Sequence, residues 1–311
     1  MHMQSPFDFP PADEPPTEPP AVENDEQVIE IRLPPVQTLA LVLSSPHSGR
    51  DYPADFVAGS QLSPHLLRGS EDCFVDELFA DGPSLGAPLL RALFPRAYVD
   101  PNREPYELDP AMFSERLPSY VNTASPRVAA GLGTVPRVVA SGAVIQRDKL
   151  DFADAAARIE CCYKPYHAAL ARLLRETHRR FGHCLLLDCH SMPSVGGPTD
   201  KDPGRNRVDF VIGDRHGASC ARPVADAVEA TLRDLGYTVR RNLPYAGGFV
   251  TRHYGRPNER CHALQIEINR ALYMDEARLQ RTDYFATLAS HMRQLVAVLG
   301  GIGADALDAA A

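Results

Sequence analysis

The sequence predicts an α/β fold, a single three-layer α/β/α domain with a mostly parallel mixed sheet. Short apolar segments typical of strands alternate with segments of helical periodicity along most of the chain. This alternation favours a largely parallel sheet with helices on both faces. The length of 311 residues suits one large α/β domain or two small ones.

The expected strands follow from the apolar patterning. Residues 28–31 alternate between apolar and polar side chains, as a strand with one buried face does. Residues 39–43 and 184–187 are continuous apolar runs, which are typical of strands buried in a parallel sheet. Further strands are expected over 97–99, 209–213 and 262–269.

Helical segments separate these strands. Periodic apolar residues predict a helix over 151–181 that stops at Gly182. A short helix is expected over 71–81, an amphipathic helix over 219–235 and a last helix over 275–299. Residues 101–142 are rich in Pro, Gly and Ser and are expected to form long loops.

The first 26 residues differ from the rest of the chain. They carry seven acids and no Lys or Arg, and seven prolines lie within residues 6–20. Proline lacks the N–H that helices and sheets need, and the segment has too few apolar groups to offset its ordering entropy. We therefore expect a disordered tail over 1–26, one ordered domain over 27–300 and a flexible C-terminus over 301–311.

The charge balance excludes two classes of partner. Seven of the 40 acids lie in the tail, so the remaining 33 nearly balance the 32 bases and the body carries a net charge of −1. Nucleic-acid binding needs a basic footprint and a membrane surface attracts basic segments, so neither partner is expected. No apolar run approaches the roughly 20 residues of a membrane helix.

The cysteines and the start of the chain indicate the compartment. The first residues have neither a basic nor an apolar signal segment. The seven cysteines are odd in number and form no CxxC motif, so a disulfide framework is not expected. Both observations favour the reducing cytoplasm.

Three polar residues stand at or near the carboxyl ends of expected strands. His47 follows 39–43, His190 follows 184–187, and Glu267 lies near the end of the strand over 262–269. Ligands of open α/β sheets bind outside these strand ends. Two neutral imidazoles and one carboxylate, with a position left open for water, form a catalytic zinc site. The candidate carboxylates are Glu71, Asp72 and Asp51.

Glu267 is the candidate general base. A metal ion lowers the pKa of bound water to about 7, but a base still has to accept the proton. Glu267 stands between Ile266 and Ile268, where a carboxylate is costly unless it has a role. The alternative is an outward-facing glutamate on a half-exposed strand, just as each histidine could simply cap a strand by hydrogen bonds.

An anionic small-molecule substrate would be recognised by arginine, because guanidinium pairs bidentately with carboxylate. Asn102 and Arg103 lie in a loop after the strand expected over 97–99. Arg252 and Tyr254 follow the glycine-bearing segment 246–248, which could close over a ligand. The alternative for each arginine is a solvated surface side chain.

At these residues the sequence resembles the N-formylglutamate amidohydrolase family, whose members are similar to zinc carboxypeptidases and aspartoacylase-type enzymes. The matching segments, in chain order, are SPHSG (45–49), DCFVDELF (72–79), DPNREP (100–105), GTVPR (133–137), DCHSMPS (188–194), DFVIGD (209–214), AGGFVTRHYGRP (246–257) and QIEINRALYMDE (265–276). The resemblance implies a zinc-carboxypeptidase-like (phosphorylase/hydrolase-like) fold for the domain over 27–300.

The resemblance also implies an activity, the hydrolysis of an N-acyl amino acid. The typical reaction converts N-formyl-L-glutamate and water to formate and L-glutamate, the last step of one histidine-degradation route. A related amidohydrolase or carboxypeptidase-like enzyme with another N-acyl or peptide substrate is an alternative, and so is a non-catalytic binder of acidic metabolites. Zinc is the expected metal, although a site with nitrogen and oxygen ligands also accepts iron, cobalt or manganese.

The roles carry over residue by residue. By resemblance, His47 and His190 fall on the metal-binding histidines, Asp72 on the acidic position and Glu267 on the general base. The remaining candidates would act on the substrate: Asn102 and Arg103 resemble a pair that binds a substrate carboxylate, Arg103 would also stabilise the oxyanion, Arg252 would grip a second carboxylate, and Tyr254 would donate a hydrogen bond. Zinc carboxypeptidases carry HxxE, whereas residue 50 here is Arg. The acidic ligand is therefore expected further along, at Asp72 or at its rival Glu71.

Overall fold

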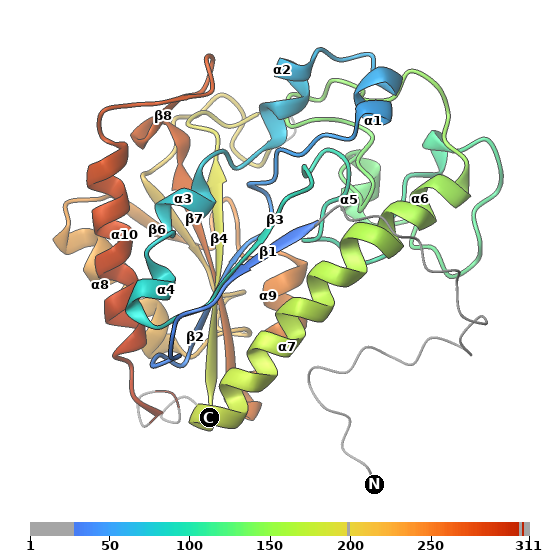
Figure 1. Ribbon diagram of the computed structural model, residues 1–311. Helices are drawn as coiled ribbons and strands as arrows, with labels where there is room; N and C mark the ends of the chain where they lie inside the picture. Colours follow the sequence, from blue (N-terminus) through green and yellow to red (C-terminus); the bar gives the residue numbers. More distant parts are fainter. Residues whose placement is uncertain (1–27, 198–199, 305–306, 308–311) are drawn as a thin grey trace, which may run out of the picture.

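A mixed sheet forms the centre of the molecule. The computed structural model describes residues 28–197, 200–304 and 307, so the tail expected over 1–26 and part of the segment over 301–311 lie outside the described residues. Within them the sheet has seven strands in the order β1–β3–β2–β4–β7–β5–β6 (Figure 1). The strands span Ile29–Arg32 (β1), Leu41–Ser45 (β2), Leu89–Ala92 (β3), Cys184–Met192 (β4), Phe210–Gly213 (β5), Val239–Arg241 (β6) and Cys261–Asn269 (β7).

The strand directions confirm the expected fold class. The neighbours β3, β2, β4 and β7 run parallel to one another, and β5 runs parallel to β6. Only the pairs β1–β3 and β5–β7 are antiparallel. The carboxyl ends of the central parallel strands therefore meet at one edge of the sheet, which is uppermost in Figure 1.

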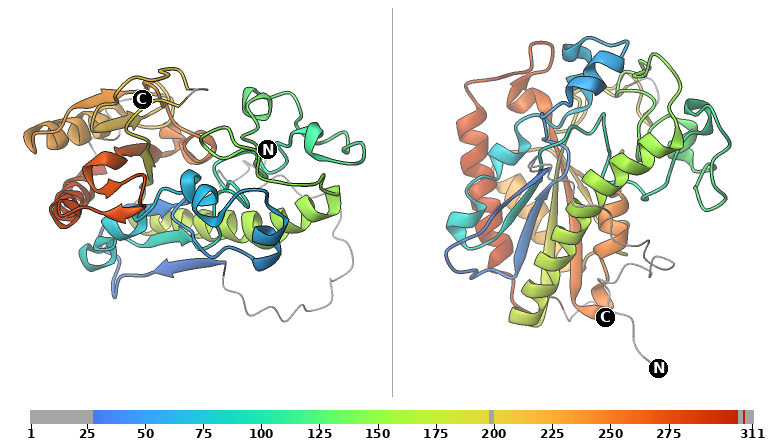
Figure 2. Two further views of the ribbon diagram at one scale, coloured as in Figure 1. Left: turned by 90° about the horizontal axis from the view of Figure 1, so that it is seen from above. Right: turned by 45° about the vertical axis from the view of Figure 1, so that its right-hand side comes forward.

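Helices cover both faces of the sheet and complete three layers (Figures 1 and 2). One face carries α3 (Val75–Leu78), α4 (Gly82–Leu85), α8 (Arg222–Asp234) and α10 (Phe285–Gly300), and the other carries α7 (Lys164–Phe181) and α9 (Phe249–Tyr254). Successive side chains of a strand point to opposite faces. Thus Leu41 and Leu43 pack into the core under α8 and α10, and Val42 packs under α7.

The expected strand over 97–99 is wrong. These residues form a turn in which Tyr98 and Val99 donate their N–H groups to the carbonyl of Pro95, at 2.9 and 3.2 Å. The strand of this region is β3, before the proline, and it pairs with β1 and β2. Proline cannot donate to a strand ladder, so the strand ends before Pro95. Neither β3 nor β6 is expected from the apolar pattern.

The strand expected over 184–187 continues further. β4 reaches Met192, because β7 pairs with it along its whole length as far as Asn269. His190 therefore lies within a strand and not after one, which corrects the expectation from the sequence.

The helices agree with the sequence in outline and differ at two places. The helix expected over 151–181 consists of α6 (Phe152–Arg158), a π-helical turn over Ile159–Tyr163, and α7, which ends at Gly182 with φ of 76°. The last helix begins at Phe285 instead of residue 275. The carboxylate of Asp275 accepts the N–H groups of Ala277 and Arg278 and closes a turn between β8 (Met274–Asp275) and β9 (Gln280–Arg281).

Loops with short helices gather around the carboxyl edge of the sheet. These helices are α1 (Ala54–Gly59), α2 (Pro64–Leu67) and α5 (Pro126–Ala129). The segment over 101–142 is mostly loop, as expected, and buries Leu108 and Val135 in a small core of its own. In the part of the chain that the structure describes, no helix has the length and apolar character needed to cross a bilayer.

Candidate metal centre

One face of the sheet changes from apolar to polar toward the carboxyl ends of its strands. On β4, Cys184 and Leu186 pack in the core under α7, and two residues further along the same face Asp188 and then His190 follow. On β7, Ala263 packs in the same core, and Gln265 and Glu267 continue its face. The strand alternation thus places a group of buried polar side chains beyond the last apolar residues of this face, at the carboxyl ends of β4 and β7.

Three side chains converge at this place. Nδ1 of His47 lies 3.3 Å from Oδ2 of Asp72, Nδ1 of His190 lies 3.0 Å from the same oxygen, and the two Nδ1 atoms are 3.1 Å apart. All three side chains are buried. Each offers a ligand atom for a single metal ion. The structure therefore brings together both predicted histidines and one of the three candidate carboxylates.

The loop after β2 explains why Asp72 and not Glu71 joins the cluster. The N–H of Asp72 donates to the carbonyl of His47 at 2.9 Å, which fixes the two residues side by side. The carboxylate of Glu71 instead accepts hydrogen bonds from Tyr52 (2.8 Å) and Arg68 (3.0 Å). The third candidate, Asp51, has an exposed side chain. Arg270 donates to Oδ1 of Asp72 at 3.0 Å, so Oδ2 is the oxygen that faces the histidines.

Two further carboxylates lie against the outer nitrogens of the imidazole rings. Nε2 of His47 lies 2.8 Å from Oδ1 of Asp100, and Nε2 of His190 lies 2.9 Å from Oδ2 of Asp188. Carboxylates that accept the outer N–H of a histidine hold its other nitrogen as a metal ligand. Sequence analysis missed Asp100 and Asp188, although Asp188 stands two residues before His190 on the same face of β4.

The cluster requires a positive charge. Nδ1 of each histidine and Oδ2 of Asp72 lie 3.0–3.3 Å from one another, so either protons on the rings or a bound cation can hold these atoms together. Burial opposes the charge on His190, but Asp188 and Asp72 outweigh it and raise the pKa of its imidazole. Burial likewise opposes the charge on Asp72, but the hydrogen bonds from the two histidines hold its pKa well below the usual range. A divalent cation fits this donor set.

Glu267 lies beside the cluster and is buried. It stands opposite His190 in the β4–β7 register, and directly paired residues of parallel strands share a face. Its exposed fraction is 7%, so it is not an outward-facing glutamate. Burial raises the pKa of its carboxyl to about 8; Asp72 and Asp188 add to the rise, and His190 and Arg96 oppose it.

Arg96 belongs to the same site and was not found from the sequence. It lies in the turn after Pro95, and its Nε donates to Oδ2 of Asp100 at 3.0 Å. Its charge acts on Asp72 and on Glu267. The turn replaces the expected strand over 97–99, so the sequence pattern gave no signal for this side chain.

The pair Asn102 and Arg103 supports the site from the loop after Asp100. Oδ1 of Asn102 accepts the N–H of Val250 at 2.8 Å, and its amide nitrogen lies 3.2 Å from Nε2 of His190. Arg103 is buried: Nε donates to the carbonyl of Leu132, Nη1 to the carbonyl of Asn102, and Nη2 lies 3.3 Å from Asp100. Burial lowers the pKa of Arg103 to about 10.

The two other predicted substrate residues differ in position. Arg252 has a side chain that is 48% exposed and pairs with Glu104. Tyr254 is buried, and its hydroxyl lies 2.9 Å from Nδ1 of His167, within the aromatic group under α7. Arg252 thus lies at the surface, whereas the hydroxyl of Tyr254 is buried against His167.

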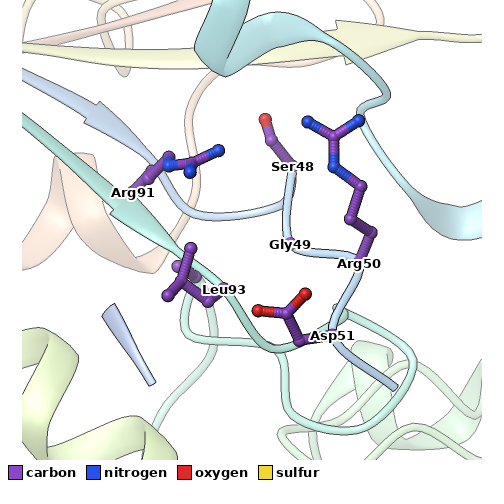
Figure 3. A pocket seen from close by; sticks show the side chains of 7 residues that line it. Ser48, Gly49, Arg50, Asp51, Arg91 and Leu93 are labelled. Carbon is purple, nitrogen blue, oxygen red and sulfur yellow. The ribbon is translucent and has the colours of Figure 1, made fainter. Parts of the chain in front are cut away.

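A separate cavity lies next to the His47 loop. It measures about 100 Å³ and is lined by Ser48, Gly49, Arg50, Asp51, Arg91, Ala92 and Leu93 (Figure 3). None of the three cluster residues lines it. Arg50 is hydrogen-bonded to Glu77, and Arg91 to Asp76. This cavity is therefore distinct from the candidate metal centre.

Comparisons with known proteins identify the family. The family model described as N-formylglutamate amidohydrolase matches residues 39–274. An N-formylglutamate deformylase of Pseudomonas putida is 27% identical and covers 86% of this chain and 94% of its own. Another N-formylglutamate deformylase, from Pseudomonas aeruginosa, is 32% identical and covers 76% of this chain and 82% of its own.

Two solved structures are similar over most of the chain. The crystal structure of N-formylglutamate amidohydrolase from Ralstonia eutropha is 40% identical, with a TM-score of 0.81, and covers 88% of this chain and 97% of its own. A gene product from Agrobacterium tumefaciens is 20% identical, with a TM-score of 0.61 and coverage of 91% and 96%, and shares the fold. The residues matched by the family model include His47 and Asp72 in the segment after β2, and the strands β4 and β7. The chain belongs to the N-formylglutamate amidohydrolase family.

Proposed function

We propose that this chain hydrolyses N-formyl-L-glutamate to formate and L-glutamate, using a divalent cation bound by His47, Asp72 and His190. The observation that carries the proposal is the convergence of three ligand atoms beside the buried carboxyl of Glu267. Family membership and the names of the relatives support the choice of substrate. We take residues 27–300 as the catalytic domain.

Zinc is the metal that we propose. Two imidazoles and one carboxylate leave a position open, and zinc in such a site lowers the pKa of bound water and polarises the scissile carbonyl. The two Nδ1 atoms would be the ligands of the ion, with Asp100 and Asp188 against the outer nitrogens of the rings.

Glu267 is the proposed general base and acid. Burial raises the pKa of Glu267 and so favours its protonated form in the metal-free protein. A cation bound beside it would favour the carboxylate form. The carboxylate accepts a proton from water as the water oxygen attacks the formyl carbon. Glu267 then returns this proton to the amine nitrogen as the C–N bond breaks.

Arginines are proposed to stabilise the negative charges of the substrate and of the developing oxyanion. We place Arg96 at the oxyanion that develops from the formyl oxygen, because its charge already acts on Asp72 and Glu267. Arg252 is the proposed partner of a substrate carboxylate, in exchange for Glu104. Asn102 and Arg103 are proposed to shape the substrate side of the site, and Tyr254 to support it through His167.

The cellular setting follows from the cysteines. All seven are free thiols in the structure, which supports a location in the reducing cytoplasm. The proposed partner is a small anionic metabolite, with no role for nucleic acid or a membrane.

Release of formate tests the proposal. Purified protein is assayed with N-formyl-L-glutamate, N-acetyl-L-glutamate and a dipeptide, before and after chelator treatment and after addition of zinc. Formate is followed for the first substrate and the freed amino acid for all three. We expect amide hydrolysis of the first substrate only, loss of this activity with chelator, and recovery with zinc. Tight binding of the substrate without formate release would contradict an enzymatic role, and faster turnover of another amide would overturn the choice of substrate.

A further inference from the structure

Two adjacent cysteines lie outside the metal centre, in the π-helical turn between α6 and α7. The Sγ atoms of Cys161 and Cys162 are 3.5 Å apart. Cys161 is exposed and Cys162 is buried. A π-turn inside an α-helix is uncommon and is frequently found at functional sites. The pair is thus an accessible vicinal dithiol within a special backbone turn.

The geometry of this pair fits one bridging atom better than a disulfide. Consecutive Cα atoms are about 3.8 Å apart, whereas disulfides usually join Cα atoms roughly 4.4–6.8 Å apart, so a disulfide here would be strained. A thiophilic atom with bonds of about 2.3 Å at a tetrahedral angle holds two sulfur atoms about 3.8 Å apart. The observed separation of 3.5 Å is close to that value.

The surroundings favour a thiolate. The contact between the two sulfur atoms and the positive charge of Arg158 lower the pKa of Cys161 to about 7. Arg158 lies over the ring of Tyr98, 4.5 Å from its centroid. Among the described residues, Nη1 of Arg158 is buried without a hydrogen-bond partner, and the charge of Arg158 acts to lower the pKa of both thiols.

We propose that Cys161 and Cys162 form a chelating site for thiophilic centres of the trivalent-arsenic class. In the reaction with an organoarsenic oxide, two As–S bonds form and the As=O bond breaks. The two thiol protons leave with the oxygen as water, and no oxidant or reductant is needed. Reaction begins at the exposed Cys161 and closes on Cys162.

A chain of contacts that begins at Tyr163 connects the site to the metal centre. Tyr163 belongs to the same π-helical turn, and its hydroxyl donates to the carbonyl of Arg103 at 2.8 Å. Arg103 in turn contacts Asp100, which orients His47. Chelation that alters the turn is therefore expected to lower catalytic activity several-fold, a consequence that rests on the proposed function.

Labelling of the full-length native protein with phenylarsine oxide tests the site. Intact-mass spectrometry should show one phenylarsenic adduct per chain, which a dithiol such as 2,3-dimercaptopropanol removes and an equal concentration of monothiol does not. Cys161→Ser changes an exposed side chain and should abolish the adduct, and Cys162→Ser should do the same. Circular dichroism confirms that each variant is folded.

The chain contains its own control. Cys184 and Cys261 stand directly opposite each other on β4 and β7, but both are buried. They remain in both variants, so an adduct that persists in Cys161→Ser would place the reaction elsewhere and overturn the proposal. Absence of an adduct on the native chain would also overturn it. Because mass is the readout, these results do not depend on whether the protein releases formate.

Discussion

Replacement of Glu267 by glutamine should stabilise the metal-free protein while it removes the general base. Burial raises the pKa of this carboxyl to about 8 in the folded state, from 4.5 for the unfolded chain. A raised folded-state pKa gives stability that is fully present below the unfolded value and is lost as the pH rises through the folded value. Glutamine has the shape of the protonated carboxyl and does not titrate.

The magnitude follows from the two pKa values. Between pH 5 and pH 7 the unfolded chain releases this proton and the folded chain largely keeps it. This difference lowers the free energy of unfolding of the unsubstituted protein by roughly 2–3 kcal/mol, a loss that Glu267→Gln avoids. Groups that do not interact with Glu267 titrate alike in both proteins and cancel in the comparison. His190 is an exception, because the charge of Glu267 contributes to the raised pKa of its imidazole.

Urea unfolding of chelator-treated protein measures this effect. We expect the stability of Glu267→Gln relative to the unsubstituted protein to increase by roughly 2–3 kcal/mol from pH 5 to pH 7. The zinc-loaded variant should lose roughly 10²–10⁴-fold in kcat, as expected for a missing general base. If the stability difference between the two proteins is the same at pH 5 and pH 7, Glu267 does not keep its proton in the folded state. Near-full turnover of the variant would show that Glu267 is not the general base.

Three further substitutions test the surroundings of the site. Asp100→Asn should weaken zinc binding by about 10–100-fold in isothermal titration calorimetry, because it loosens the ring of His47; unaltered affinity would deny this role. Arg252→Ala should raise KM for the formylated substrate with little change in kcat, and a loss confined to kcat would contradict substrate binding. Gly248→Ala should lower kcat/KM, because its Cβ would lie 2.3 Å from Oδ1 of Asn102; full activity would show that Asn102 can move without consequence.

The sequence predicted the two histidines and Glu267 because polar side chains with suitable chemistry follow the apolar residues of the predicted strands. His190 and Glu267 occupy the polar ends of apolar strands, and the β4–β7 register places them side by side. The residue pattern alone left Asp72 and Glu71 open, and only the family resemblance favoured Asp72. That choice depends on the backbone hydrogen bond from Asp72 to His47 and on the engagement of Glu71 by Arg68.

The supporting residues depend on tertiary contacts that no local pattern reveals. Arg96 and Asp100 lie in a turn that follows Pro95, where apolar residues had indicated a strand. Tyr254 follows a glycine-bearing segment that looked able to close over a ligand, yet it stands at the end of α9 with its hydroxyl on His167. The contacts of both segments join parts of the chain that are distant in sequence.

Metal content tests the central claim most directly. Elemental analysis of the purified protein after dialysis should find one divalent ion per chain, and the same analysis of folded His190→Ala should find that the ion is lost. Equal metal content in the two proteins would show that His47, Asp72 and His190 do not form the metal centre.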